Sequence, residues 1–599
     1  MSIVPLNKVT LCGLSHDQEM VLEGLQHLGC LHLIPLRSSP SQESETALFV
    51  RDEDAHEALL HLMDVRRRRH QVLDNVDFNF DQVLAMALAN KQSRREAEDR
   101  RYFLTNRIRD LEPWGDFTLP DIEQLGGYRF WFYRVPYAKI KSLQELEWPW
   151  QQVAADHRFA YVVVISKQEP PAAALPVART YTGAVPITDL KHELQRVEIQ
   201  LEDLDAEHEA LSRWIHLFSK NLARADDQAA IQYASAQTHQ EVGIFVVQGW
   251  MPVQDLKSLE AFAKQQELAL LVEPARPDDT PPTLMDNPPG LSSGQDLVSF
   301  YQTPGYRSWD PSIAVFFSFA VFFAMILSDA GYALVLALIV ACYWPSMGNS
   351  EGGRHFRVLS VMGLIAAVIY GVLVGSYFGA GPEQVPRIGS LLTRFQILNI
   401  NNYDAMMQLA IAIGCLHITF ANIVAALGAG GFAGKAQPLG WIVVIGGGLV
   451  LGYGGTTGSH LGTGLLVGGF LIIFLGGFLG SRQKNLFLRL VAGLGSLTQI
   501  SKLFGDIMSY LRLFALGLAS ASLALTFNQL AHQVYQSVPG LGLLLSILIL
   551  LLGHGINLAL GIISGFVHGL RLNFIEFFNW GIADEGYPFQ AFAKKESNP

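Results

Sequence analysis

Eight long apolar stretches fill the second half of this chain, and they limit its fold more than any other feature. They cover 312–328, 329–345, 357–378, 405–427, 438–455, 461–480, 490–532 and 541–580. A helix of about 20 mostly apolar residues crosses the hydrocarbon core of a bilayer. The sequence therefore predicts an α-helical membrane domain over 312–599 with eight transmembrane helices.

Basic residues in the connecting loops predict the orientation of these helices. They fall in alternate loops and are Arg354, Arg357, Lys435, Arg482, Lys484 and Arg489. The loops between them, 380–404, 456–460 and 533–540, are neutral. Because cytoplasmic loops carry the excess of Lys and Arg, both termini are predicted to be cytoplasmic.

The last two apolar stretches are too long for ordinary membrane helices, and each contains one arginine, Arg512 or Arg571. At about 1.5 Å per residue each stretch measures roughly 60 Å, so both helices are predicted to be steeply tilted. A guanidinium cannot lose its charge, and holding it at bilayer depth costs about 2.5–3.5 kcal/mol on insertion scales. Such a charge is tolerated beside a wet cavity or a carboxylate, which indicates ion transport.

Further polar residues of these two stretches fall on shared helix faces at about 100° per residue. The candidates to line an ion half-channel are Asp506, Ser509, His554, Asn557, Ser564, His568 and Glu576. Small residues beside them, including Gly561, Gly565 and Gly569, would let another helix or a moving surface approach closely.

Several of these candidates also have a purely structural explanation. Asp506 lies one turn after Lys502, and charges at this spacing can neutralise each other. His554 and Asn557 could join helices by hydrogen bonds. Glu576 lies off the polar face, where it could be solvated or paired locally.

Two more polar residues of the membrane half favour structural roles. Asp329 interrupts the first apolar run, where it could cap a helix. His417 stands alone on an apolar face, so we expect a core histidine with a satisfied side chain. In contrast, no carboxylate of the chain lies at an obvious pairing position for Arg512 or Arg571. Their counter-charge is expected to belong to another subunit.

The first half of the chain has the composition of a water-soluble domain. Residues 1–300 contain 44 Asp and Glu against 29 Lys and Arg, whereas 301–599 contain 10 against 14. Strand patterns at 7–13, 30–36, 242–249 and 268–273 flank helices and predict two β-α-β units. Together they predict a proximal α/β lobe formed by 1–50 and 230–275.

A long insertion separates the two parts of the proximal lobe. Two polar helices at 51–112 and 187–228 predict the arms of an antiparallel coiled coil, and strand patterns between them predict a distal lobe at 120–185. The fold class is thus an N-terminal α+β cytoplasmic dumbbell, 1–290, joined by a linker at 291–311 to a helical membrane domain. The Pro-rich segment 275–290 ends the dumbbell. A plain helical bundle is the alternative for the first half.

Several functions are disfavoured by the sequence. The four cysteines, Cys12, Cys30, Cys342 and Cys415, lack the spacing of a zinc site or a disulfide framework. The acidity of the first half argues against nucleic acid as a partner. The nearest approach to a phosphate loop, 428–436, lacks its first glycine and its final Ser or Thr. We therefore predict no bound nucleotide, cofactor or metal.

Specific motifs resemble those of subunit I of bacterial V/A-type rotary ATPases, the counterpart of the V-ATPase a-subunit. SYLRLFALGLA at 509–519 and FVHGLRLNFIEFF at 566–578 resemble the blocks around that family's two essential arginines, carried here by Arg512 and Arg571. Further matches are EVGIFVVQGWMP (241–252), PPTLMDNP (281–288), YQTPGYRSWDPS (301–312), FFAMILSDAGY (322–332) and GSYFG (375–379). Thr498 and Gly561 depart from acidic residues that are common in the family.

The resemblance implies a stator subunit that is not an enzyme by itself. It would form proton or sodium half-channels against rotor-ring subunits that each carry a buried carboxylate. The other implied partners are peripheral-stalk subunits, the central-stalk cap and membrane lipid, in a bacterial cell (inner) membrane. The alternatives are a self-contained ion channel or secondary transporter with a coiled-coil regulatory domain, and a purely structural membrane anchor.

Overall fold

The computed structural model describes the chain apart from residues 1, 37–41, 75–77, 120–122, 124, 172–173, 176, 184, 242, 385–388, 400–401, 482–484, 583 and 596–599. Arg482 and Lys484, whose charges support the predicted orientation, lie outside the described residues. The chain forms two compact units. The first comprises Met1–Leu11, Cys30–Leu33 and Gln248–Ala591, and the second comprises Cys12–Gly29, Ile34–Val247 and Phe592–Pro599.

The two predicted β-α-β patterns are present. α1 (Gln18–Leu28) connects β1 (Leu6–Leu14) to β2 (His32–Ile34), and α6 (Leu256–Gln265) connects β8 (Ile244–Pro252) to β9 (Ala269–Pro274). These strands pair in the order β2-β8-β1-β9, and the short β7 (His239–Glu241) pairs with β8. Gly29 ends α1 in the left-handed region, with φ of 63°, which glycine adopts at little cost.

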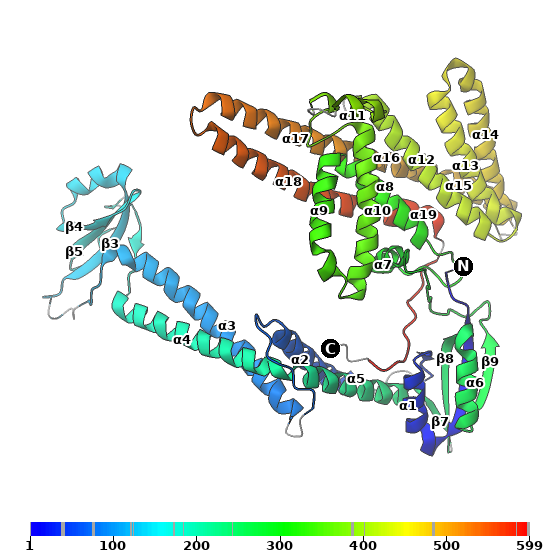
Figure 1. The fold of residues 1–599 in the computed structure, drawn as a ribbon, viewed down its shortest axis with the longest axis horizontal. Coiled ribbons are helices and arrows are strands. Elements are labelled where there is room, and N and C mark those ends of the chain that lie inside the picture. Colours follow the sequence, from blue (N-terminus) through cyan, green and yellow to red (C-terminus); the bar gives the residue numbers. More distant parts are fainter. Residues whose placement is uncertain are drawn as a thin grey trace. The chain divides into compact units, whose positions relative to one another are not determined.

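A long helical hairpin dominates the second unit (Figure 1). α3 (Phe80–Leu111) packs against α4 (Ile187–Leu211), and a 3-10 turn joins α4 to α5 (Ile215–Gln237). The prediction of one helix over 51–112 was wrong at 64–79. α2 (Gln42–Met63) ends before these residues, and α3 begins after them. Asn79 starts α3 as an N-cap, accepting a hydrogen bond from the amide of Gln82 at 3.2 Å.

The distal lobe is a four-stranded sheet in the order β4-β5-β3-β6. Its strands are β3 (Arg129–Pro136), β4 (Trp150–Ala155), β5 (Phe159–Ser166) and β6 (Arg179–Thr180). β3 and β5 are antiparallel, with Arg129 opposite Ser166 and Pro136 opposite Phe159. Both central strands lie where the alternation of apolar residues predicts them.

Two histidines form a buried contact inside the helical hairpin. The rings of His61 on α2 and His208 on α4 are stacked, with centroids 4.0 Å apart. His61 Nε2 lies 3.1 Å from Asn90 Oδ1, and Asn90 donates in turn to Glu207 at 2.9 Å. Burial lowers the pKa of His61, and the charges of nearby cations lower it further. The folded hairpin therefore favours the neutral imidazole.

We expect the packing of α2 against α3 and α4 to weaken on acidification. The unfolded chain binds a proton at His61 more readily than the folded chain, so stability is full above about pH 6.5 and declines below it. Hydrogen exchange of the α2 and α4 amides, corrected for the intrinsic effect of pH, measures this change. His61→Phe keeps the stacked ring and should abolish the pH dependence, whereas His192→Phe, at an exposed position of α4, should not.

Among the described residues, seven helices are long and apolar enough to cross a membrane, and α8 (Ser312–Leu327) is a shorter apolar helix. Together they match the eight predicted stretches. Five of the seven longer helices are α9 (Ala330–Met347), α10 (Glu351–Val374), α12 (Tyr403–Gly428), α13 (Gly431–Tyr453) and α14 (Gly455–Gly480). The predicted linker is not wholly irregular, because it contains α7 (Ser292–Tyr301).

The two longest stretches are interrupted rather than continuous helices. The first consists of α15 (Leu486–Leu497), α16 (Ile500–Ser509) and α17 (Leu511–Ser537). The second consists of α18 (Gly542–Arg571), a π-helical segment at Leu572–Phe577, and α19 (Phe578–Gly581). α17 and α18 lie side by side and cross α9 and α10 at a steep angle (Figure 1). This agrees with the predicted tilt.

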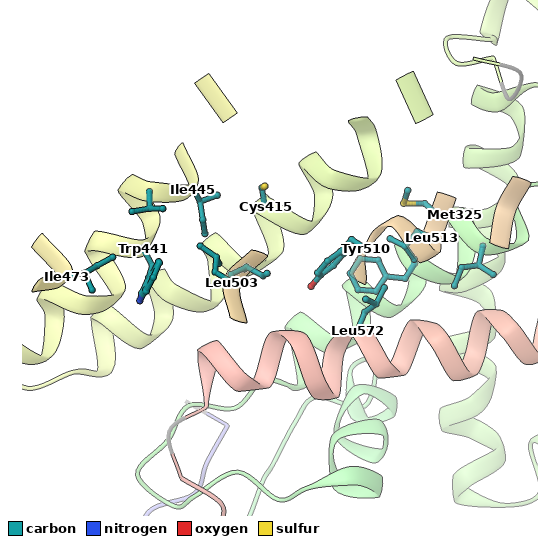
Figure 2. Close-up of a cluster of buried hydrophobic side chains, with 13 residues drawn as sticks. Met325, Cys415, Trp441, Ile445, Ile473, Leu503, Tyr510, Leu513 and Leu572 are labelled. Carbon is teal, nitrogen blue, oxygen red and sulfur yellow. The ribbon is translucent and has the colours of Figure 1, made fainter. Parts of the chain in front are cut away.

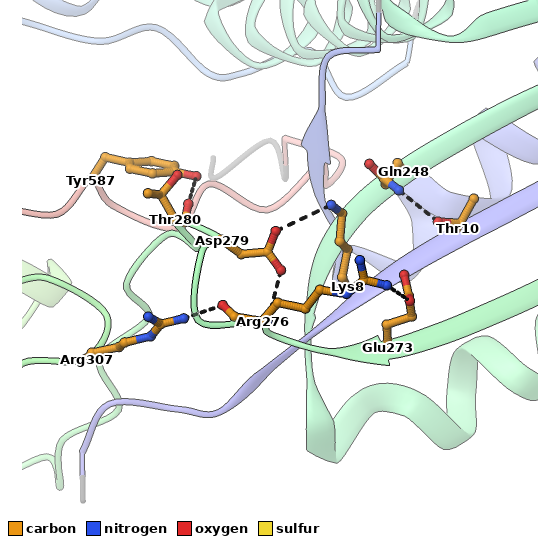
Figure 3. Close-up of polar contacts among 9 residues, drawn as sticks. All are labelled: Lys8, Thr10, Gln248, Glu273, Arg276, Asp279, Thr280, Arg307 and Tyr587. Atoms are coloured by element: carbon orange, nitrogen blue, oxygen red, sulfur yellow. Dashed lines mark hydrogen bonds and ion pairs between the residues drawn. The ribbon is translucent and has the colours of Figure 1, made fainter.

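The Pro-rich segment between β9 and α7 is held by polar contacts (Figure 3). Lys8 Nζ lies 3.7 Å from Asp279 Oδ1, and Arg307 donates to the carbonyl oxygens of Arg276 and Pro277. The residues that follow α19 return to the same segment, where the Tyr587 hydroxyl donates to the carbonyl of Thr280 at 2.8 Å. These contacts tie the end of the last membrane helix to the strands of the first unit.

Candidate functional site

Arg512 and Glu576 face each other between α17 and the segment that follows α18. Arg512 Nη1 lies 3.9 Å from Glu576 Oε1, and the two side chains are 23% and 2% exposed. The sequence offers no obvious pairing position for Arg512, and the prediction that its counter-charge belongs to another subunit was wrong in so far as Glu576 of the same chain lies beside it. Because 3.9 Å exceeds hydrogen-bond distance, the two charges attract each other without a closed contact.

The π-helical segment explains why helical spacing misplaced Glu576. In a π-helix hydrogen bonds run from residue i to i+5, so one turn takes more residues than in an α-helix. Glu576 is five residues after Arg571 and lies within Leu572–Phe577. It therefore turns less far from the polar face than α-helical spacing predicts. The result is a buried carboxylate that faces Arg512 instead of a solvated one.

Several buried polar atoms in this region have no hydrogen-bond partner among the residues that the structure describes. They are Arg512 Nη1, Glu576 Oε2, His568 Nδ1 and His417 Nε2. Buried polar atoms are almost always satisfied by protein or by ordered water. His417 is only partly the satisfied core histidine that we predicted, because its Nδ1 lies 2.8 Å from the Tyr510 hydroxyl while its Nε2 is unpaired.

Arg571 is the more open of the two arginines. It is exposed at the end of α18, and no hydrogen bond or ion pair joins it to another residue of the described chain. For Arg571, a counter-charge that belongs to another subunit therefore stays a prediction. A cation without a partner at this depth requires water, a lipid headgroup or the acid of another protein.

His554 and Asn557 belong to a separate network that joins three helices. The Tyr332 hydroxyl on α9 lies 2.7 Å from His554 Nδ1 and accepts from Asn557 Nδ2 at 3.0 Å. On α17, Asn528 Oδ1 lies 3.0 Å from His554 Nε2, and the Ser520 carbonyl accepts from Asn557 at 2.8 Å. Every one of these contacts is between helices, which favours the structural explanation for both residues.

Asp329 caps α9. Its carboxylate accepts hydrogen bonds from the amides of Tyr332, Phe378 and Gly379 and from the Ser376 hydroxyl, at 2.7–3.0 Å. The side chain is 2% exposed. Four donors satisfy a buried carboxylate, so Asp329 holds the α8–α9 interruption and the GSYFG loop together.

The remaining candidates have local partners or none. Asp506 Oδ2 accepts from Trp580 Nε1 at 2.7 Å, and the ammonium of Lys502 lies 5.6 Å from the centre of the Trp580 ring. Lys502 and Asp506 form no direct ion pair among the described residues, because both contact Trp580, but their charges still attract each other. Ser509 donates to the carbonyl of Gly505 in its own helix at 3.1 Å. Ser564 is half-buried and forms no hydrogen bond with the other residues that the structure describes.

The predicted small residues of α18 pack against α8. A Cβ at Gly565 would lie 2.7 Å from the ring of Phe323, and one at Gly561 would lie 3.2 Å from Leu327. These glycines therefore allow a neighbouring helix of the same chain to approach closely. Alanines on the exposed face of α17, Ala515 and Ala519, have no such neighbour in the described chain.

Sequence reasoning missed Tyr332, Asn528, Tyr510 and Trp580 as partners of the polar residues. Tyr332 lies within a quoted motif, yet a tyrosine in an apolar run gives no sign of its partner. The signal that could have indicated Tyr510 is its place two residues before Arg512. No spacing rule connects Trp580 to Asp506, because a π-helical segment separates Trp580 from α18.

We predict that His554→Ala and Asn557→Ala each destabilise the membrane domain by about 1 kcal/mol, a typical value for a polar contact between membrane helices. Because both side chains share the Tyr332 hydroxyl, the double variant should lose less than the sum. Thermal unfolding in detergent measures the loss. Thr526→Ala is the control, since Thr526 donates only to its own helix at Ser522. Additive losses would contradict a shared network.

These features define a multi-pass membrane protein with an N-terminal α/β domain and two arginines near its C-terminus, one partly buried and one exposed. The chain is 26% identical to the V-type ATP synthase subunit I 1 of Treponema pallidum, and the match covers 96% of this chain and 97% of that relative. It is also 26% identical to the V-type ATP synthase subunit I of Chlamydia pneumoniae over 59% of this chain and 61% of the relative's length.

The chain is a homologue of subunit I of the V/A-type ATP synthases. No protein-family model matches it. The solved cytoplasmic N-terminal domain of subunit I, homolog of subunit a, of V-ATPase, matches 44% of this chain with 16% identity and a TM-score of 0.23.

Proposed function

We propose that this chain is the stator subunit of a V/A-type rotary ATPase or ATP synthase and moves ions between two half-channels against a rotor ring. The observation that carries the proposal is the incomplete contact between Arg512 and Glu576. The Arg512 side chain is 23% exposed and forms no hydrogen bond with Glu576, so the exposed part of its guanidinium can still receive an acid from outside the chain.

In the proposed mechanism, the rotor carboxylate reaches Arg512 as it leaves the lipid. The nearby guanidinium favours the ionised carboxylate, which releases its proton into one half-channel. Because Glu576 also attracts the guanidinium of Arg512, the rotor acid is bound weakly enough to leave again. After leaving Arg512 the acid takes up a proton from the other half-channel, because the neutral form enters lipid at lower cost.

Arg571 supplies a second fixed charge on the neighbouring helix. It is exposed and has no partner in the described chain, as expected for a group that meets the rotor or a half-channel. His568 lies one turn before Arg571, and its buried Nδ1 is unpaired. We infer that His568, together with Ser564, Ser509 and Asp506, is near the water of a half-channel. A fixed positive charge between the half-channels also blocks a direct leak of protons.

We propose that the first half of the chain, with its α/β lobe, helical hairpin and distal sheet, resists the torque of the rotor. The long hairpin and distal sheet would bind peripheral-stalk subunits and the central-stalk cap, in a bacterial cell membrane with both termini cytoplasmic. Supporting this, the hairpin is stiffened by buried apolar contacts such as Leu104 and Leu201. The chain itself is proposed to bind no nucleotide, and the catalysis of the complex would belong to other subunits.

A self-contained ion channel is the second candidate. It predicts that the arginines are paired within the chain, and the contact of Arg512 with Glu576 favours it. Arg571 does not fit this candidate, because no acid of the described chain lies within ion-pair distance of it. The two candidates differ in whether transport requires a rotor ring.

We predict that Arg512→Ala abolishes ATP-driven ion pumping while the ring and the nucleotide-binding subunits still co-purify. Without the guanidinium, nothing at this depth favours the ionised rotor acid. Acidification of vesicles that contain the assembled complex measures pumping. Arg489→Ala is the matched control, because Arg489 donates to the carbonyl of Phe478 on α14, away from the pair. Normal pumping by Arg512→Ala would overturn the proposed function.

We predict that Glu576→Gln slows pumping by roughly fivefold, about 1 kcal/mol, without abolishing it. Arg512 would then pair only with the rotor acid and release it more slowly. The rate of vesicle acidification at saturating ATP measures the effect. Co-purification of the ring with the variant shows that the complex is still assembled. A self-contained channel predicts instead that ion flux through purified chains without a ring changes in this variant.

A further inference from the structure

A second buried polar contact lies next to the Arg512–Glu576 pair. His417, on α12, has its Nδ1 2.8 Å from the hydroxyl of Tyr510. The His417 ring also stacks on Phe577, with centroids 4.2 Å apart and planes 2° from parallel. Tyr510 is two residues before Arg512, and Phe577 directly follows Glu576. One side chain therefore touches the flanks of both charged residues.

Both contact points are places where the helices depart from regular geometry. Tyr510 separates α16 from α17, and Phe577 is the last residue of the π-helical segment. Both side chains are fully buried. Figure 2 shows Tyr510 between α12 and the last helix, close to Leu572. A Cβ at Gly414, one turn before His417, would lie 2.7 Å from the Tyr510 ring, so the ring is seated directly on α12.

Apart from its bond to Tyr510, the described contacts of the His417 ring are with aromatic rings. The ring of Phe322 on α8 meets the His417 ring edge to face at 5.2 Å, and the ring of Phe420 is parallel to that of Phe577, with centroids 6.1 Å apart. In an apolar setting, a single hydrogen bond fixes the orientation of a tyrosine more strongly than packing alone. The bond uses Nδ1, while Nε2 is buried without a partner.

We propose that His417 is a positioning residue for ion translocation. Through Tyr510 and Phe577 it fixes the two irregular segments that set the separation between Arg512 and Glu576. This inference rests on the proposed function, since it assigns His417 to the same site. It gives a role to a histidine that the sequence alone places in an apolar core.

The test uses the complete membrane complex, with pumping normalised to the amount of chain that co-purifies with the ring. His417→Phe keeps the stacked ring and Tyr510→Phe keeps the phenyl ring, but each removes the hydrogen bond. Each should slow ATP-driven acidification about fivefold, the factor for one neutral hydrogen bond. The double variant should be no slower than either single one, because both remove the same contact.

Two further variants separate positioning from packing. The amide of Asn lies near the position of Nδ1 and that of Gln near Nε2, so His417→Asn should restore most of the rate and His417→Gln should not. Tyr453→Phe is the matched control. It removes a phenol of α13 that donates to the Gln408 carbonyl of α12 at 3.0 Å, a hydrogen bond that involves neither His417 nor Tyr510, and it should pump normally.

The outcomes distinguish this inference from the proposed function. If His417→Phe and Tyr510→Phe pump normally while Arg512→Ala is inactive, His417 has no positioning role and the proposed function stands. Additive losses in the double variant, or equal rates for the Asn and Gln variants, would also overturn the positioning role. Normal pumping by Arg512→Ala would overturn the proposed function itself.

Discussion

The permanent charge of Arg512 is the constraint on which the arrangement of the last membrane helices depends. A lysine or a carboxylate can shed its charge when it is buried, but a guanidinium cannot. The chain lowers the cost by leaving Arg512 partly exposed and by placing Glu576 at 3.9 Å. This distance is close enough for strong attraction in a medium of low dielectric constant and too long for a hydrogen bond. The arginine is thus stabilised and still available.

Two departures from α-helical geometry create this intermediate state. The break at Tyr510 lets α17 leave the direction of α16, and the π-helical segment turns Glu576 toward Arg512. π-Helical turns are rare and frequently occur at functional sites. Here the local cost is offset by apolar packing, since Leu572 and Phe577 are fully buried.

The sequence predicts the elements of this structure well and their contacts poorly. Apolar periodicity identifies the eight membrane stretches and the strands of both lobes, because each depends on local composition. Two predictions failed for physical reasons. The phase of Glu576 assumed α-helical turns, and the arm over 51–112 ignored the capping signal at Asn79. The cap at Asp329 could be predicted as one of two explanations, yet its loop partners could not.

The polar face of α18 combines two different kinds of site. At one end His554 and Asn557 are fully engaged with Tyr332, Asn528 and Ser520, which fixes α18 to α9 and α17. At the other end, His568 of α18 lies with Arg512 of α17 and Glu576 of the π-helical segment, and each of the three keeps an unpaired buried atom. A satisfied network resists movement, whereas unpaired atoms exchange partners at little cost. A helix that must stay still while a charged surface passes it needs both, and α18 has them about three turns apart along one face.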